Sequence, residues 1–378
     1  MNNDRQWRFD PLDSWFFREA RAFDISGSNE LNSLFPPPAR TVAGAVRTLI
    51  GETQGVDWQE FASAEKYTDL KQSIGSGDDL GALRIRGPYP LWNNERLYPA
   101  PLHLLAKEQE YFFLKPGVIV QCDLGKVKLP KLEKALSGAK PLEEKALSGA
   151  KPLENAWLTS TDLQRVLKSE LPEKVWHSRD LYSVESRLGI ARNNAQRTVA
   201  DGLLYQTRHI RPRAELAIGA TVSGIDPELY PAHGVIRFGG EGRASTVTVD
   251  ESSLPLVEAP KTNSSNLLLV LLTHADFDGK WELPGFHAET QGDVKIWRGI
   301  INGIELILHS AVLGKAVREG GWDLLNKKPR PVQSLIPAGS VYFCTVQGDV
   351  QEAVKTLHGC HIGQHTALGR GELAIGFW

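Results

Sequence analysis

The sequence has little sulfur and no long apolar run. It contains three cysteines and one methionine in 378 residues. The cysteines, Cys122, Cys344 and Cys360, lie far apart without a C-x-x-C pair, which argues against a disulfide framework and fits a reducing compartment. No segment approaches the roughly 18 apolar residues of a membrane span, and the first ten residues show no apolar signal segment. We therefore expect a cytoplasmic protein.

The sequence also lacks an excess of charge of either sign. The formal net charge is −2, which excludes a uniformly basic nucleic-acid coat, so any site for a polyanion must be a local patch. Hydrophobic residues make up 41% and charged residues 23%, as is typical of a globular protein with a sizeable core. The length favours two domains.

Catalytic and metal-binding motifs are missing as well. There is no G-x-S-x-G nucleophile elbow and no Gly-Lys-Ser/Thr phosphate loop. Histidines and a cysteine cluster in residues 358–365, but Gly359 and Gly363 interrupt the helix that would align them as metal ligands. We expect neither a metal nor a cofactor.

Residues 33–48, SLFPPPARTVAGAVRT, combine a proline run with the start of a helix. The prolines hold the chain extended and deliver it into the first turn. The spacing of Val42, Val46, Leu49 and Ile50 predicts one buried stripe on a helix that ends near Thr53. The exposed side presents only arginine, threonine and glycine, and free N–H groups at a helix start suit a phosphate. The candidates for anion binding are Arg40, Thr41, Gly44 and Arg47. The alternative is that the glycines only allow the helix to pack closely on a sheet.

A second candidate surface lies in residues 187–213, which hold six arginines, no lysine and one acid, Asp201. The local net charge is about +5, and arginine offers phosphate a planar fork and can stack on bases. Residues 126–151, by contrast, are positive almost entirely through lysine, which is typical of a solvated surface. The alternative is that the arginines pair with acids elsewhere in the chain. The candidate RNA ligands in this window are Arg187, Arg192, Arg197, His209 and Arg211.

Two glycine-rich loops complete the candidate sites. Residues 234–245, GVIRFGGEGRAS, place Gly240 and Arg243 between two predicted strands, where they suit an RNA backbone or form an ordinary hairpin turn. Near the C-terminus, Gly369, Arg370 and Gly371 precede the last predicted strand, where they would form a phosphate-gripping loop.

The order of predicted elements gives an α+β fold. Strands are expected near residues 7–9, 111–114, 118–122, 203–209, 215–222, 234–238, 267–273, 304–311, 340–346 and 372–377, with helices at 162–167 and 349–357. The unit EKALSGAKPLE occurs twice at residues 133–154 and predicts a surface insertion. Residues 250–265 are polar and proline-containing, as in a linker. We predict two ferredoxin-like (RRM-like, βαββαβ) domains with insertions, at residues 1–255 and 262–378.

Together these segments resemble a known family. Residues 11–23 (PLDSWFFREARAF), the proline–helix segment, SRLGI, LYQTRHIRP and FGGEGR resemble, in this order, the third subunit of the type III-B CRISPR (Cmr) effector complex, a RAMP protein. The resemblance implies no catalysis by this subunit. It also implies a role in antiviral defence, in which the chain grips the 5′ tag of the guide RNA and contacts the large polymerase-like subunit and the backbone RAMP subunits. By position, it adds Arg18 and Arg21 to the RNA path, together with Arg187, His209, Arg211 and Arg243.

Three hypotheses follow for the function. In the first, the chain is a non-catalytic RNA-binding scaffold of a ribonucleoprotein. In the second, it is a RAMP endoribonuclease that processes precursor guide RNA with His209 or His177. In the third, it is an adaptor whose arginines meet acidic protein partners.

Overall fold

The computed structural model describes most of the chain. It covers residues 3–20, 30–108, 110–123, 125–133, 149–193, 198–251, 254–323 and 326–378, with the backbone alone at 133, 190–193 and 198–204. Most of the tandem repeat lies outside the described residues. Within them, no helix is long and apolar enough to cross a membrane.

The chain forms two compact units that alternate along the sequence. Unit 1 comprises Met1–Arg96, Ser178–Leu254 and Arg318–Gln333, and unit 2 comprises Leu97–His177, Pro255–Val317 and Ser334–Trp378. The predicted linker at 250–265 contains one of the crossings between units. The prediction of two consecutive domains differs from this division, because residues 97–177 belong with the C-terminal part and 318–333 with the N-terminal part. Such pairings between distant segments leave no local sequence signal.

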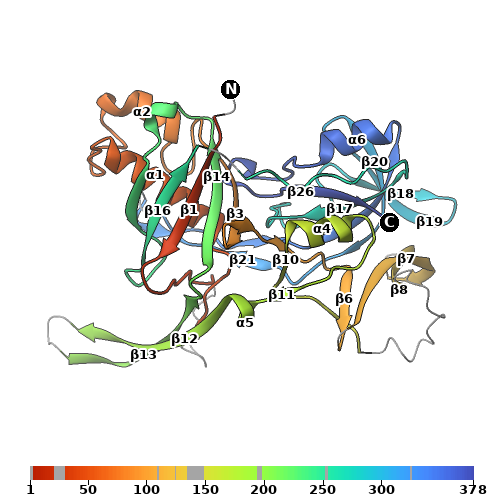
Figure 1. The fold of residues 1–378 in the computed structure, drawn as a ribbon, viewed down its shortest axis with the longest axis horizontal. Coiled ribbons are helices and arrows are strands. Elements are labelled where there is room, and N and C mark those ends of the chain that lie inside the picture. The colour runs from red at the N-terminus through yellow and green to blue at the C-terminus, as the bar shows by residue number, and fades with distance from the viewer. Residues whose placement is uncertain are drawn as a thin grey trace. The chain divides into compact units, whose positions relative to one another are not determined.

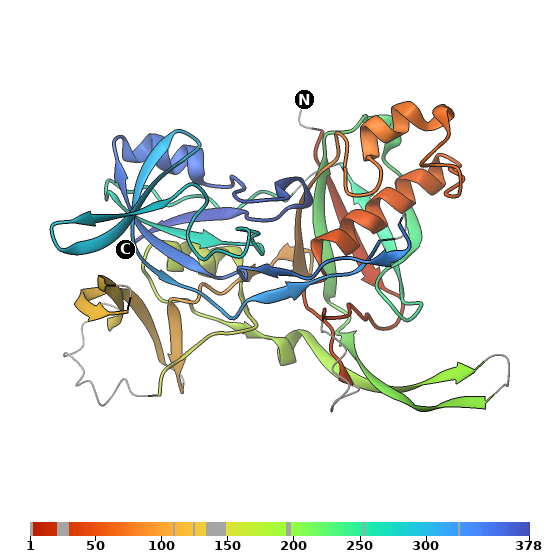
Figure 2. The same ribbon diagram turned by 180° about the vertical axis from the view of Figure 1, so that it is seen from behind.

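Unit 1 is built on a six-stranded antiparallel sheet (Figure 1). Trp7 and Phe9, two residues apart on one strand, are fully buried, as the period of a strand requires. Figure 2 shows helix α1 (Ala39–Thr53) along one face of this sheet. The sheet order is β15 (His233–Arg237), β16 (Ala244–Asp250), β1 (Arg5–Pro11), β14 (Leu216–Ser223), β3 (Arg84–Trp92) and β4 (Glu95–Arg96).

Helix α1 buries the stripe that its sequence predicts. Val42, Val46 and Ile50 are fully buried, and Leu49 nearly so. A Cβ atom at Gly51 would lie 2.5 Å from the Trp58 ring, so this glycine serves close packing, whereas a Cβ at Gly44 would meet nothing within 4 Å. The packing explanation therefore holds for Gly51 and does not hold for Gly44.

A long hairpin extends away from the sheet of unit 1 (Figures 1 and 2). It consists of β12 (Tyr182–Asn193) and β13 (Thr198–Pro212), with β2 (Glu30–Leu31) parallel to β13. The remaining elements of unit 1 are short: α2 (Thr68–Ile74), α5 (Ser178–Leu181), the 3-10 helices at Glu65–Tyr67 and Pro227–Leu229, and the hairpin of β22 (Trp322–Asp323) and β23 (Lys328–Pro329).

Unit 2 has its own six-stranded antiparallel sheet, whose strand β17 is buried on both faces. On one face Leu267, Leu269 and Leu271 belong to a core with α6 (Val350–Leu357). On the other, Leu268 and Val270 join a core with α4 (Ser160–Leu167). The sheet order is β18 (His287–Gln291), β19 (Val294–Ile301), β20 (Ile304–Val312), β25 (Val341–Gln347), β17 (Asn266–Leu271) and β26 (Leu373–Phe377).

The remaining strands form smaller sheets. In unit 2, β8 (Gly125–Glu133), β7 (Glu110–Cys122), β6 (Leu104–Lys107) and β9 (Lys151–Pro152) form one sheet, and β11 (Trp176–His177), β10 (Ala156–Leu158) and β5 (Tyr98–Pro99) form another. Strands β21 (Val317–Glu319) and β24 (Gln333–Leu335) pair with each other, and a 3-10 helix covers Thr366–Leu368.

The fold is thus a strand-rich mixture of helices and antiparallel sheets, in agreement with the α+β prediction. Both α-helices that the structure describes in unit 2 have side-chain N-caps: the hydroxyl of Thr159 accepts the N–H of Asp162, and the carboxylate of Asp349 accepts the N–H of Glu352. All the predicted strands named above are present, but several others were not predicted, among them β3, β8, β12, β18 and β19. Strand β18 is largely exposed, so it lacks the alternation of apolar residues that marks a buried strand face.

Gly376 provides a test of the packing of α4 on the sheet. A Cβ atom there would lie 2.7 Å from the carbonyl oxygen and 2.9 Å from the Cα of Leu167, which are backbone atoms at the end of α4. We expect Gly376→Ala to lower the free energy of unfolding by about 1–3 kcal/mol, measured by denaturant titration. Gly44→Ala, at an exposed helical position with open space, is the control and should raise it by about 0.5–1 kcal/mol. Equal effects of the two substitutions would contradict the packing described here.

Candidate nucleic-acid interface

The root of the β12–β13 hairpin places several predicted site residues on one face. Glu185 pairs with His209 and Arg187 with Thr207, while Arg211 lies two residues beyond His209. Because side chains of a strand alternate and directly paired residues share a face, Glu185, Arg187, His209 and Arg211 point to the same side.

An N-terminal segment is fixed against this face by the buried Trp15. The backbone of Trp15 exchanges two hydrogen bonds with Ile210, at N···O distances of 2.9 and 2.8 Å. Its indole Nε1 donates to the Ser245 hydroxyl at 2.9 Å. Asp13 and Ser14 are thereby held beside the hairpin.

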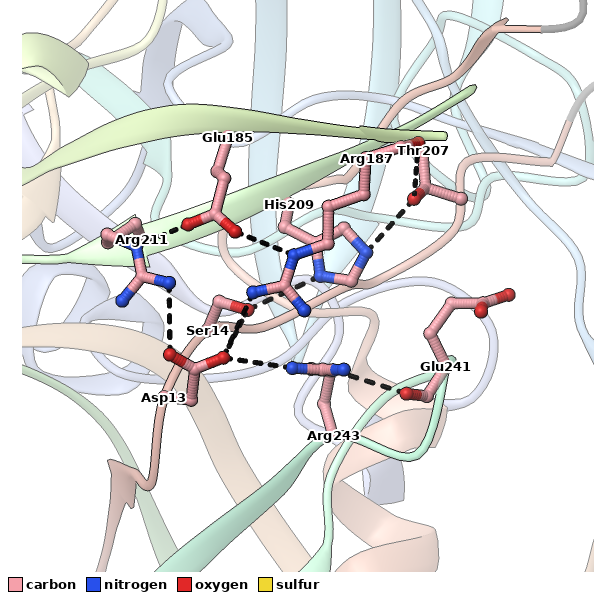
Figure 3. Close-up of polar contacts among 9 residues, drawn as sticks. All are labelled: Asp13, Ser14, Glu185, Arg187, Thr207, His209, Arg211, Glu241 and Arg243. Atoms are coloured by element: carbon pink, nitrogen blue, oxygen red, sulfur yellow. Dashed lines mark hydrogen bonds and ion pairs between the residues drawn. The ribbon is translucent and has the colours of Figure 1, made fainter. Parts of the chain in front are cut away.

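Three arginines from three parts of the chain converge on the carboxylate of Asp13 (Figure 3). Arg187 on β12 and Arg211 on β13 each donate to it at 3.0 Å, and Arg243, from the turn between β15 and β16, donates at 2.9 Å. The carboxylate of Glu185 accepts from Arg187 Nε at 2.6 Å and also from Arg211 Nε. These five residues are called the Asp13 cluster below.

The Asp13 cluster keeps a net positive charge, because three guanidinium groups face two carboxylates. Hydrogen bonds from Arg187 and Arg211 lower the pKa of Asp13, and those from Arg211 and Arg187 lower the pKa of Glu185. The same contacts raise the pKa values of Arg187 and Arg211. The side chains are 23–46% exposed, so an anion from solvent can reach them.

His209 lies beneath the cluster and is only 1% exposed. Its ring stacks on Phe16 at 5.0 Å, Nε2 lies 3.0 Å from the Thr207 hydroxyl, and Nδ1 lies 3.4 Å from the Ser14 hydroxyl (Figure 3). Burial, with Arg187 and Arg243 nearby, lowers the pKa of His209, so the ring is neutral at neutral pH. The structure therefore makes His209 a supporting side chain below the arginines.

The glycine-rich turn before Arg243 packs on the protein. Gly239 has a φ of +96°, and a Cβ atom there would lie 2.5 Å from the carbonyl oxygen of Phe16. The N–H of Gly240 donates to the same carbonyl at 2.8 Å. Gly240 thus uses its backbone donor to position Arg243, which favours the hairpin-turn alternative for this segment.

A second group of charges surrounds the start of α1. Arg40 donates to Asp78 at 3.0 Å, Arg330 also pairs with Asp78, and Arg47 donates to the carbonyl of Gly77 at 2.9 Å. Burial lowers the pKa of Arg47. These residues, Arg40, Arg47, Asp78 and Arg330, are called the Asp78 cluster. The sequence analysis missed Asp78 and Arg330, for which the Gly- and Asp-rich run at 75–81 was the one local signal.

The segment before α1 connects the hairpin to this helix. The hydroxyl of Ser33 donates to the carbonyl of Arg208 at 2.7 Å, and the Phe35 ring lies 4.8 Å from that of Tyr182. At the helix start, the N–H of Thr41 already donates to Pro38 at 2.9 Å. Gly44 is exposed on the helix surface.

For the other predicted arginines the structure describes the side chain of Arg18 only. Arg18 is exposed and its backbone bridges to Ser33. Arg192 belongs to β12, with its backbone alone described, and Arg21 and Arg197 lie outside the described residues. Among the described arginines, pairing with acids is extensive: Arg187, Arg208, Arg211 and Arg243 all contact carboxylates. The ion pairs that this alternative expects are therefore present for Arg187, Arg208 and Arg211, and Arg243 joins the same network.

The C-terminal glycine loop does not present its arginine to solvent. Arg370 is 1% exposed and donates to the carboxylate of Asp276 at 3.3 Å. The prediction that it grips phosphate is wrong in this structure, because burial and this ion pair make Arg370 part of the interior. His358 is likewise a structural residue: its Nε2 contacts the carbonyl of Val257 at 2.6 Å, and its Nδ1 accepts the N–H of Ile375 at 3.1 Å.

Comparison with known proteins gives one match over nearly the whole chain: residues 7–378 match the model of the CRISPR-associated protein (Cas_Cmr3) family. No relative was found among curated proteins. Similar solved structures include a chain of the type III-B Cmr-beta complex bound to cognate target RNA and AMPPnP, with 14% identity, 89% of this chain and 86% of that chain covered, and a TM-score of 0.48. A chain of the Csm3–Csm4 subcomplex of the type III-A CRISPR-Cas interference complex is also similar, with 12% identity and a TM-score of 0.36. The match covers 91% of this chain and 94% of that chain.

The fold and the site define a two-unit, strand-rich α+β protein with arginine clusters at the root of a long hairpin. The chain belongs to the CRISPR-associated protein (Cas_Cmr3) family. It is therefore a subunit of a type III CRISPR effector complex, as the resemblance implied.

The buried histidines predict a loss of stability on acidification. Burial lowers the pKa of His209 and lowers those of His103 and His274 to about 3 and about 4. Below about pH 6.5 the unfolded chain takes up protons that these native rings do not, so the stability present above that pH is lost as the pH falls. Each such histidine contributes a slope of up to about 1.4 kcal/mol per pH unit.

Denaturant titrations at about pH 7.5 and about pH 5.5 measure this slope while staying above the range in which the carboxylates titrate. His209→Gln should show a smaller slope than the wild type. An unfolding free energy that is the same at both pH values would contradict the assignment of neutral rings.

Proposed function

We propose that this chain is a non-catalytic RNA-binding subunit of its effector complex, which grips the 5′ tag of the guide RNA and docks the large subunit. The observation that carries the proposal is the Asp13 cluster. Its three arginines are preorganised, partly exposed and net positive, which is the chemistry that recognises phosphate.

The free donors of the cluster support this function. Arg187 and Arg211 each donate Nε to Glu185 and Nη2 to Asp13, whereas Arg243 donates Nη1 to Asp13 and Nε to the Glu241 carbonyl. A guanidinium carries five N–H donors, so each arginine retains donors that a phosphate oxygen can accept without breaking these contacts. The carboxylates hold the forks in place, and the phosphate supplies the missing negative charge.

The burial of His209 supports the absence of catalysis. A general acid or base must come within hydrogen-bond reach of the proton that it transfers. His209 is buried, its ring stacks on Phe16, and its two ring nitrogens lie within 3.0–3.4 Å of the Thr207 and Ser14 hydroxyls. Figure 3 shows these two polar contacts. The endoribonuclease alternative with His209 as the catalytic residue would require this face to open, and the version with His177 is left to experiment.

Strand order supports two ferredoxin-like domains as the framework. In each six-stranded sheet, four antiparallel strands follow the order fourth, first, third, second along the chain: β16, β1, β14, β3 in unit 1 and β26, β17, β25, β20 in unit 2. This is the order of a βαββαβ unit. Helix α1 follows the first strand of unit 1, and α6 follows the third strand of unit 2.

We expect the double variant Arg187→Ala, Arg211→Ala to weaken binding of a 5′-tagged guide RNA at least about tenfold. Two lost phosphate contacts should also reduce the slope of log affinity against log salt by about 1.4. The measurement is fluorescence anisotropy over a range of salt concentrations.

Arg298→Ala is the matched control for this experiment. Like Arg187, Arg298 is 30% exposed and lies between two carboxylates, Glu289 and Glu305, but in unit 2. It should bind RNA as the wild type does. Unchanged RNA binding by the double variant would contradict the proposal, and a simultaneous loss of a protein partner would favour the adaptor hypothesis.

The enzyme alternative predicts a different outcome. Incubation of the purified protein with precursor guide RNA should give no cleavage, with His209→Ala and His177→Ala indistinguishable from wild type by gel analysis. Cleavage by the wild type that disappears in His209→Ala would overturn the scaffold function. Co-purification with the large subunit, followed by sequencing of bound RNA, should give a common 5′ end.

A further inference from the structure

The β22–β23 hairpin exposes a tryptophan on unit 1. The side chain of Trp322 is 56% exposed, the largest exposed fraction among the tryptophans that the structure describes as exposed. Trp322 pairs with Pro329 across the hairpin, so the indole and the proline ring share a face. A rigid proline beneath an indole makes a firm platform, since neither side chain has much conformational freedom to lose.

In this segment the acidic side chains are buried and most of the basic side chains are exposed. The acids turn inward: Glu319 is 3% and Asp323 7% exposed. Asp323 is occupied locally, since its carboxylate accepts the backbone N–H of Asn326 at 3.1 Å and the side-chain amide of the same residue at 2.9 Å. Among the described residues of 318–330, the exposed charged residues are basic. Arg318 lies on β21 and Lys327 in the turn of the hairpin, while Lys328 pairs with Asp323 and so lies on the face opposite Trp322.

Arg330 fixes the hairpin beside the start of α1. Its backbone N–H donates to the Gly321 carbonyl at 2.9 Å, which closes the hairpin, and its guanidinium pairs with Asp78. Asp78 also pairs with Arg40 on the first turn of α1. Arg330 thus ties the hairpin to the Asp78 cluster within unit 1, through a guanidinium that also lies 3.8 Å from the carboxylate of the buried Asp323.

We infer that the β22–β23 hairpin is a second RNA-binding element, in which Trp322 stacks on an unpaired base while Lys327 and Lys328 contact the flanking phosphates. The inference rests on the proposed function, because it requires that the chain binds RNA. An exposed aromatic ring among cations is the arrangement by which proteins hold single-stranded nucleic acid, where the ring takes the base and the cations follow the backbone. A ligand that carries both rings and negative charges fits this surface better than a purely apolar one.

The test compares the full chain with its Trp322→Ala and Trp322→Phe variants. The probes are a labelled oligoadenylate of about ten nucleotides and an abasic oligomer of the same length and charge. Trp322→Ala should weaken binding of the oligoadenylate by roughly fivefold to a hundredfold and leave binding of the abasic oligomer unchanged. Trp322→Phe should retain most of the affinity, because phenylalanine also stacks.

Two further variants separate stacking from charge and from general damage. Lys327→Ala with Lys328→Ala should weaken both probes and lower the salt slope by about 1.4. Trp58→Ala is the control, since Trp58 is also exposed, at 42%, but lies between the exposed acids Asp57 and Glu60. It should bind both probes as the wild type does.

The outcomes distinguish this inference from the proposed function. If Trp322→Ala binds oligoadenylate as tightly as the wild type while the Arg187, Arg211 double variant binds RNA more weakly, the inference about Trp322 is wrong. The proposed function is then still supported. If Trp322→Ala loses the same affinity for the abasic oligomer as for the oligoadenylate, the inference is also wrong, because stacking needs a base. If Trp322→Ala keeps RNA binding but loses a protein subunit on co-purification, the hairpin is a protein contact and the inference is wrong.

Discussion

The carboxylate of Asp13 is the interaction on which the candidate site depends. It gathers arginines from β12, from β13 and from the turn between β15 and β16, three segments that would otherwise bring like charges together without compensation. Glu185 binds two of the same arginines from the other side, so Arg187 and Arg211 are each held at two points. A guanidinium held at two points loses little further freedom when it meets a ligand.

This arrangement explains why a chain with a slightly negative total charge can present a site for a polyanion. Most of its arginines near the hairpin are compensated by acids, so the surplus at any one place is small. Selectivity for a polyanion then depends on the position of the surplus positive charge and on the orientation of the arginine donors. It depends less on a broad positive potential over the surface. The Asp78 cluster follows the same principle at the start of α1, where it places one carboxylate between Arg40 and Arg330.

The sequence predicted the parts of the molecule that depend on local patterns. The proline run and the stripe of Val42 and Val46 define α1, and a strand period is visible where one face is buried. Glu185 is within reach of such reasoning, because it lies two residues from Arg187 on the same strand face. Asp13 is not, since 174 residues separate it from Arg187, and only the folded chain brings them together. Arg330 and Asp78 are 252 residues apart, so the sequence indicated Arg40 and Arg47 of the second cluster but not these two partners.

The alternation of the two units along the chain has a consequence for how the protein can be divided. A chain truncated at residue 255 would retain α4 but lose β17 and β26, the strands that cover its apolar side. The complementary fragment would keep β22, β23 and Arg330 without the Asp78 that anchors them. Neither fragment is a self-contained folding unit, so the two halves of this subunit must be inherited, expressed and studied as one polypeptide.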